Sequence, residues 1–166
     1  MPSSRAGEPT FTAEELFALA YQFHQAGDLD RAIRLYRRSI LVRPTAQAHT
    51  FLGWALSHQG RLDEAIEECR RAIALDPNFG NPWNDIGVYY IEQGRPEDAI
   101  PYLEQALESP DYCCYFFPHT NLGRIYLARG EYLRARAAFE RALEIEPQYE
   151  VARLYLAMLR QFLREM

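Results

Sequence analysis

The residues that could carry chemistry in this chain are three cysteines and four histidines. Cys113 and Cys114 are adjacent, so they lack the two-residue gap that lets a cysteine pair place both sulfurs on one tetrahedral zinc. His119 lies close in the sequence, but one histidine and two adjacent cysteines do not complete a site, and Cys69 falls at a position expected in the core. The histidines do not cluster by spacing; they are His24, His49, His58 and His119. The sequence therefore predicts no metal site and no cofactor, and a redox sensor at Cys113 and Cys114 is only a distant alternative.

Sequence motifs of catalysis are missing as well. The chain contains no GxSxG, no P-loop, no HExxH and no glycine-rich phosphate loop. Catalysis needs reactive groups held together in a shielded pocket, and no set of residues suggests one. We expect no enzyme and no small-molecule substrate.

Length and composition describe an ordinary folded domain. The 166 residues are 48% hydrophobic and 25% charged, which is typical of a single globular domain. No apolar run approaches the roughly 20 residues that span a bilayer, and the N-terminus does not resemble a secretory signal, so we expect a cytoplasmic protein without membrane insertion. The net charge of −5 gives no reason to expect nucleic acid. All 18 basic residues are arginine, which indicates a GC-rich, bacterial source.

A repeat organises the whole sequence. Four glycines follow similar residues, at Gly27, Gly60, Gly94 and Gly130, with separations of 33, 34 and 36 residues. An alanine lies five residues after each glycine, and a glycine or alanine lies seven residues before it. Apolar residues recur at helical spacing on both sides of every glycine. Each unit is thus predicted to be two amphipathic helices joined by a tight turn at the glycine.

The repeat resembles the tetratricopeptide repeat (TPR). The residues that carry this resemblance in the two central units are Gly53, Leu56, Gly60, Ala65, Ala72 and Pro77, and then Trp83, Gly87, Tyr90, Gly94, Ala99 and Ala106. The resemblance implies an all-α fold, a right-handed superhelical solenoid of antiparallel helix pairs. We expect a flexible segment at 1–12 and one domain over 13–166. Within that domain, the predicted repeats span 13–45, 46–79, 80–115 and 116–149, and a capping helix spans 150–164.

The family resemblance also implies a concave groove lined by the first helix of each unit. Its groove-facing positions lie 13, 10, 6 and 3 residues before the turn glycine. The candidate partner contacts at these positions are Phe17, Tyr21, His24, Thr50, Trp54, Asn81, Asn84, Val88, Thr120 and Arg124. Aromatic rings there could hold apolar side chains, amides could bond a peptide backbone, and Arg124 could bind a carboxylate. Alternatively, some of the aromatic residues could pack against the N-terminal segment, which contains Phe11.

Two further surfaces are candidates for contact. Arg31, Arg34, Arg37 and Arg38 recur at helical spacing in the second helix of unit one, and they are either a solvated convex face or a site for an acidic partner. The lengthened link after unit three contains Tyr115, Phe116 and Phe117. Its aromatic residues either fill the gap between units three and four or form a contact edge for a partner.

These features favour a protein–protein interaction scaffold over an enzyme. We expect an adaptor that holds a peptide or segment of another protein in its groove, and family analogy suggests assembly of a bacterial multiprotein machine. The alternative is a self-associating scaffold that uses the 112–117 link or an edge helix. The first hypothesis predicts a monomer, and the second predicts a weak homo-oligomer.

Overall fold

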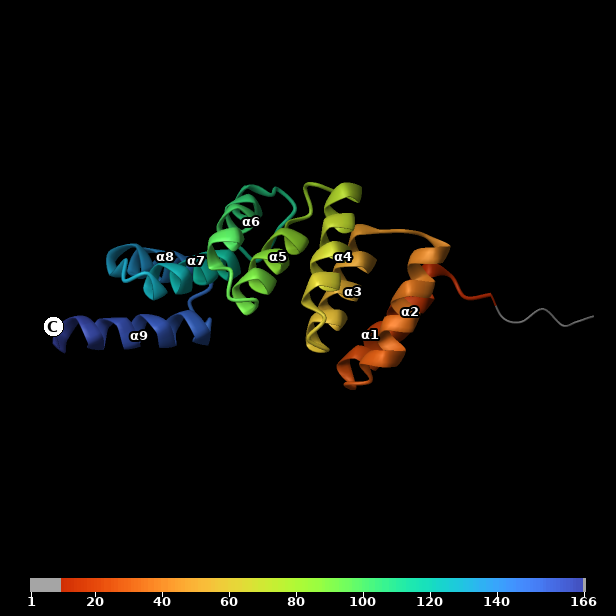
Figure 1. Cartoon of the computed structure of the whole chain (residues 1–166), viewed down its shortest axis with the longest axis horizontal. Helices are drawn as coiled ribbons and strands as arrows, with labels where there is room; N and C mark the ends of the chain where they lie inside the picture. Colours follow the sequence, from red (N-terminus) through yellow and green to blue (C-terminus); the bar gives the residue numbers. More distant parts are fainter. Residues whose placement is uncertain (1–9, 166) are drawn as a thin grey trace, which may run out of the picture.

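The computed structural model describes residues 10–165, and these residues form nine α-helices joined by short links (Figure 1). The helices form successive antiparallel pairs that stack side by side into a solenoid. The first helices of the pairs are α1 (Ala13–Gln25), α3 (Ala46–His58), α5 (Gly80–Glu92) and α7 (Phe116–Ala128). The second helices are α2 (Leu29–Val42), α4 (Leu62–Leu75), α6 (Pro96–Glu108) and α8 (Tyr132–Ile145), and α9 (Glu150–Glu165) follows alone. The predicted all-α class is confirmed.

The N-terminus of α1 is stabilised by capping hydrogen bonds. The Thr12 side chain accepts a hydrogen bond from the Glu15 amide at 3.1 Å, and the Glu15 carboxylate accepts one from the Thr12 amide at 2.8 Å. This reciprocal box satisfies two amides that would otherwise lack partners. Most of the segment expected to be flexible, residues 1–9, lies outside the described residues. No helix within residues 10–165 is long and apolar enough to cross a bilayer.

The four repeated glycines end the first helix of each pair. Gly27, Gly60, Gly94 and Gly130 have φ between +72° and +81°, a conformation that side chains with a Cβ rarely adopt. In the first turn the Asp28 amide donates to the Phe23 carbonyl and the Gly27 amide to the His24 carbonyl, which is the Schellman pattern. Because this turn reverses the chain within three residues, the second helix packs at once against the first.

A second column of small residues sets how closely the paired helices approach. A Cβ added at Gly87 would lie 2.5 Å from Leu103, and one added at Gly123 would lie 2.6 Å from Phe139. Leu103 and Phe139 are completely buried. The glycine columns noted in the sequence therefore have two separate roles, one in the turn and one in helix packing.

The link after unit three departs from the repeat. The Gly80 amide donates to the Asp111 carbonyl and the Asp111 amide donates to the Asn78 carbonyl, both at 3.2 Å, so the links on either side of unit three pair as a short parallel bridge. Tyr112 is buried directly over Gly80, where a Cβ would lie only 2.4 Å away. The bridge thus lies at the link that follows Gly94, where the separation between turn glycines is 36 residues instead of the preceding 34.

One acidic side chain lies at the junction between units two and three. Burial raises the pKa of the Asp85 carboxyl to about 7, and a hydrogen bond with Asn84 offsets only part of that effect. The negative charge of Asp85 in turn helps to raise the pKa of Cys69 on α4 and of Tyr112 in the link. Asp85 is therefore a costly charge in the folded state at neutral pH.

Replacing Asp85 with asparagine should stabilise the protein. The folded carboxyl ionises near pH 7 and the unfolded one near 3.8, so stability contributed by this group falls as pH rises between those values. We expect Asp85→Asn to raise the free energy of unfolding by roughly 1–3 kcal/mol at pH 8 and by much less at pH 4. Urea unfolding at both pH values measures the difference, and a gain that did not depend on pH would contradict this explanation.

Gly123→Ala should destabilise the fold although alanine is the better helix former by about 1 kcal/mol. The added methyl group would clash with the buried Phe139 ring, and overpacking of this kind costs about 1–3 kcal/mol. Thermal unfolding followed by circular dichroism checks the direction. An unchanged or higher midpoint would show that the helix pair can spread without penalty.

Candidate functional site

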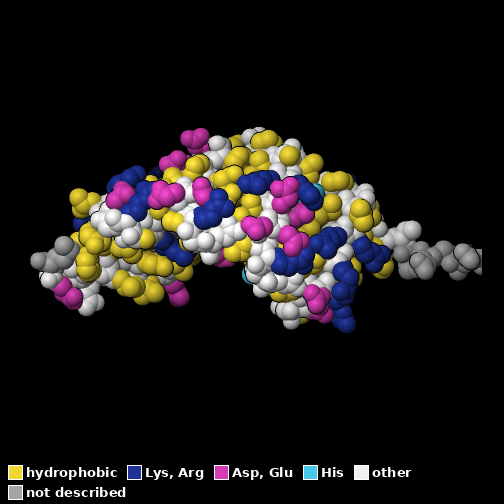
Figure 2. Space-filling model, viewed as in Figure 1, with side chains coloured by type: hydrophobic (Ala, Val, Ile, Leu, Met, Phe, Trp, Pro, Cys, Tyr) yellow, Lys and Arg dark blue, Asp and Glu magenta, His cyan; other side chains and the backbone are white. Residues whose placement is uncertain are grey.

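The first helices of the pairs form the inner layer of the solenoid. Contacts join α3 to α5, α5 to α7 and α7 to α9, whereas the second helices touch mainly the first helices on either side. Helices that approach their equivalents more closely lie on the inside of a curved stack. The space-filling view shows the arch that results and the hollow beneath it (Figure 2). The positions predicted to face the groove lie on this inner layer.

An aromatic array occupies the inner face of units one and two. Tyr21 is exposed and Trp54 is half-buried. Phe51 lies between them, with ring centroids 5.8 Å from Tyr21 and 5.7 Å from Trp54. Phe17 also packs on Phe51, at 5.2 Å. We call Phe17, Tyr21, Phe51 and Trp54 the aromatic array; Phe51 was not predicted because it lies one position beyond a groove column.

Two of the histidines, which do not cluster by spacing in the sequence, meet in the folded chain. His24 Nε2 and His58 Nδ1 are 3.2 Å apart, and His24 Nδ1 is 3.3 Å from the buried Tyr36 hydroxyl. The centroid of the Trp54 ring lies 4.4 Å from that of His24 and 5.3 Å from that of His58. Neighbouring inner helices bring together residues 34 apart in sequence, a relation that spacing within one helix does not reveal. Burial and the neighbouring His58 lower the pKa of His24.

Four of the ten predicted contacts are buried within the wall of the groove. The Thr50 and Thr120 hydroxyls donate to carbonyls of their own helices, those of Ala46 and Phe116. Asn84 is 6% exposed, and its Oδ1 accepts a hydrogen bond from Asn121 at 3.2 Å, while His24 is 5% exposed. These side chains can therefore offer a partner very little surface.

The remaining predicted contacts keep accessible surface. They are Phe17, Tyr21, Trp54, Asn81, Val88 and Arg124. Arg124 Nη1 donates to Asn121 Oδ1 at 3.3 Å, and no carboxylate lies within 4.0 Å of its guanidinium among residues 10–165. The groove is thus aromatic at its N-terminal end and has a cation without an ion-pair partner near its C-terminal end.

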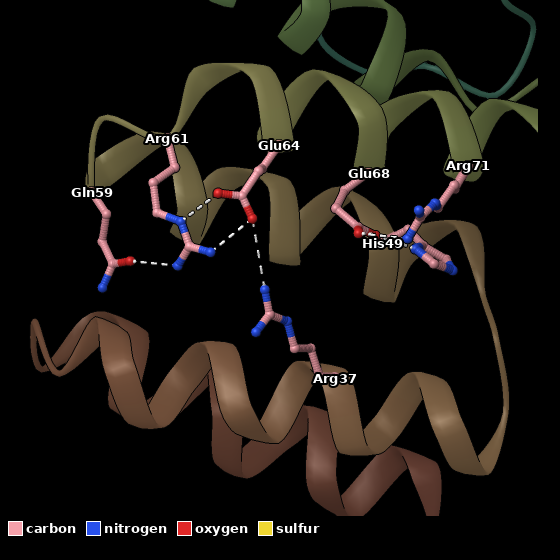
Figure 3. Close-up of polar contacts among 7 residues, drawn as sticks. All are labelled: Arg37, His49, Gln59, Arg61, Glu64, Glu68 and Arg71. Carbon is pink, nitrogen blue, oxygen red and sulfur yellow. Dashed lines mark hydrogen bonds and ion pairs between the residues drawn. The ribbon is translucent and has the colours of Figure 1, made fainter.

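Two of the four arginines predicted to form a face on α2 make ion pairs within the chain. Arg31 pairs with Asp28 at 3.4 Å, and Arg37 reaches Glu64 on α4 at 3.9 Å. Figure 3 shows Glu64 between Arg37 and Arg61, so this contact joins units one and two. Arg34 and Arg38 are exposed and have no carboxylate within 4.0 Å in the described part of the chain.

The aromatic residues of the 112–117 link are largely packed within the chain. The Tyr115 hydroxyl donates to the Ser109 carbonyl at 2.7 Å, and the Phe116 ring lies 4.9 Å from Tyr149. Phe117 keeps 36% of its surface exposed. This arrangement fits the interpretation in which the link fills the gap between units three and four, and it leaves little apolar surface for a contact edge.

The cysteines offer no evident chemistry. Burial and the adjacent Cys113 raise the pKa of Cys114 to about 11, which disfavours the reactive thiolate at neutral pH. Cys69 is completely buried in the core. Within residues 10–165, no three His, Cys, Asp or Glu side chains are grouped as metal ligands.

With the helix pairs and the inner groove described, comparison with known proteins identifies the family. The model of the tetratricopeptide repeat matches residues 17–78, 84–150 and 120–160. The chain belongs to the TPR family. Its solenoid is accordingly the right-handed superhelix of TPR proteins.

Known TPR proteins share the fold over most of this chain. The structure of pilF from Pseudomonas aeruginosa superposes with a TM-score of 0.85 at 26% identity, covering 92% of this chain and 69% of that one. Anaphase-promoting complex subunit 3 of Schizosaccharomyces pombe is 25% identical over 145 residues, and the inactive TPR repeat-containing thioredoxin TTL3 of Arabidopsis thaliana is 29% identical over 108 residues. These matches cover 86% and 64% of this chain but only 21% and 16% of the two relatives.

The contact between His24 and His58 predicts a specific titration. In the folded state, the pKa of His24 should lie below the ordinary 6.5, so an unfolded chain binds more protons near pH 6 and stability should fall as pH drops below 6.5. His58→Gln removes the electrostatic effect of His58 and should raise the pKa of His24. NMR titration of the histidine rings measures the pKa of His24 in wild type and in the His58→Gln variant. His119, whose pKa is lowered by burial and Arg141, serves as the internal control and should not move.

Proposed function

We propose that this TPR chain is a non-enzymatic adaptor that holds a segment of another protein in its inner groove. The aromatic array carries the proposal. Tyr21 is 41% exposed on the inner layer, and Trp54, which packs against His24 of α1, keeps part of its ring accessible. Tyrosine and tryptophan in such positions often dominate binding energies, and a rigid helical scaffold holds them ready without an ordering cost.

Assembly of a larger complex is the role that best suits such an adaptor. The relative from fission yeast is by name a subunit of the anaphase-promoting complex, a multiprotein assembly. The superhelix presents an extended concave surface, which suits holding a partner in place. For this chain, we propose the same kind of role in a bacterial multiprotein machine.

Removing Tyr21 and Trp54 from the aromatic array should strongly weaken capture of the partner. We expect Tyr21→Ala with Trp54→Ala to weaken binding about 30-fold or more, because two aromatic anchors are removed. The measurement is a pull-down from cells of the source organism with wild type, this double variant and Leu133→Ala. Leu133 on α8 is 78% exposed and lies outside the inner layer, so its variant should behave as wild type.

Circular dichroism of all three proteins shows whether the helices are intact. If the captured proteins remain bound to the double variant at unchanged helicity, the groove adaptor is refuted. Attention would then move to Arg34 and Arg38 on the convex side.

A further inference from the structure

Helix α9 takes the place of a fifth inner helix. It contacts both α8 and α7, as α7 contacts both α6 and α5. A step of 34 residues, the separation of Gly60 and Gly94, carries the groove positions Phe117, Thr120 and Arg124 onto Val151, Leu154 and Met158. The groove therefore continues onto α9, although the sequence has no fifth turn glycine to mark it.

Three different faces of α9 can be distinguished. Ala152, Leu156 and Leu159 are buried against the stack. A second face is exposed and apolar: Val151, Leu154, Met158 and Phe162 are 42%, 62%, 55% and 42% exposed. We call these four residues the terminal stripe, because steps of three and four place them on one side of the helix. Figure 2 shows hydrophobic side chains gathered over α9.

A third side of α9 is marked by Ala157. Ala157 on α9 corresponds to Gly123, the residue of α7 that packs against α8. Arg153 and Arg160 flank Ala157 and are exposed, and Arg160 also pairs with Glu140 of α8 at 3.4 Å, so this side of the helix is charged. The terminal stripe lies on a different side of α9, where Val151, Leu154 and Met158 hold the groove positions of the repeat.

A hollow and a cation lie beside α9, which lines the hollow through Tyr155. The hollow measures about 520 Å³ and is lined mainly by apolar groups, among them Ile91, Leu127 and Tyr155. Arg124 also lines it, and within the described residues no carboxylate is in reach of this guanidinium. The C-terminal end of the groove thus combines a linear apolar stripe, a hollow that could hold a large side chain, and a guanidinium that has no ion-pair partner among the described residues.

We propose that this end of the groove binds an amphipathic helix of a partner protein that carries a carboxylate beside its apolar face. The proposal deepens the adaptor function and rests on it. The stripe runs along the α9 axis for about 16 Å, at 1.5 Å per residue, which matches the apolar face of a helix of about three turns. A carboxylate is the natural partner for Arg124, whose planar guanidinium can donate two hydrogen bonds to it.

A display selection tests the proposal without knowledge of the natural partner. Random 16-residue peptides displayed on phage are selected against the full chain, and enriched peptides are synthesised with a fluorescent label. We expect enriched sequences to share apolar residues at i, i+3, i+4 and i+7 with Asp or Glu beside them. Binding should weaken at least tenfold in Leu154→Asn with Met158→Asn and stay unchanged in Leu133→Asn, a matched change of an exposed leucine.

A second comparison isolates the charge. Replacing the acidic residue of an enriched peptide with its amide should weaken binding to wild type several-fold but should have no effect with Arg124→Gln. Equal losses in both proteins would overturn the assigned carboxylate contact.

Other outcomes overturn the proposal in distinguishable ways. Peptides that depend on Tyr21 and Trp54 but ignore the terminal stripe would refute it and leave the adaptor function standing. Failure to enrich any peptide, or enrichment of peptides that ignore both surfaces, would count against the adaptor function as well. A dimer in sedimentation that Leu154→Asn with Met158→Asn dissociates would assign the stripe to a second copy of this chain.

Discussion

The close approach of paired helices at one small residue is the constraint on which the rest of this structure depends. Gly87 and Gly123 lie so near Leu103 and Phe139 that not even a methyl group fits between the helices. With each pair held at that distance, its two helices face opposite sides of the stack, one inward and one outward. The groove exists because this geometry recurs along the chain, and its side chains need not be polar or reactive for it to form.

The packing of inner helices against one another explains which groove positions are open. Residues ten before the turn glycine, such as Asn84 and Thr120, lie against the neighbouring inner helix and are buried. Residues six positions before the turn glycine, such as Tyr21 and Trp54, lie outside the contact between neighbouring inner helices and keep accessible surface. One inner helix therefore offers a partner a narrow strip, and a binding surface must be assembled from strips on several units.

The fold could be predicted from the sequence because the residues that determine it lie close together in the chain and recur in every unit. Each turn glycine and each small packing residue marks the same point in every unit, so four weak signals support one another. The site depends on contacts between units and was harder to predict. His58 meets His24 from the next unit, and Asn84 is covered only because Asn121 follows one unit later. The terminal stripe was missed because α9 ends without the glycine that marks the register elsewhere.

The bridge between the links around unit three bears on how the solenoid would respond to mechanical tension. Asn78 and Gly80 at its start are hydrogen-bonded to Asp111 at its end, so the chain enters and leaves this unit at nearly one point. A force that separates the termini would load these two bonds in shear before it reached α5 or α6. Units without such a bridge would extend first, and unit three would act as the stiff segment of an otherwise springlike stack.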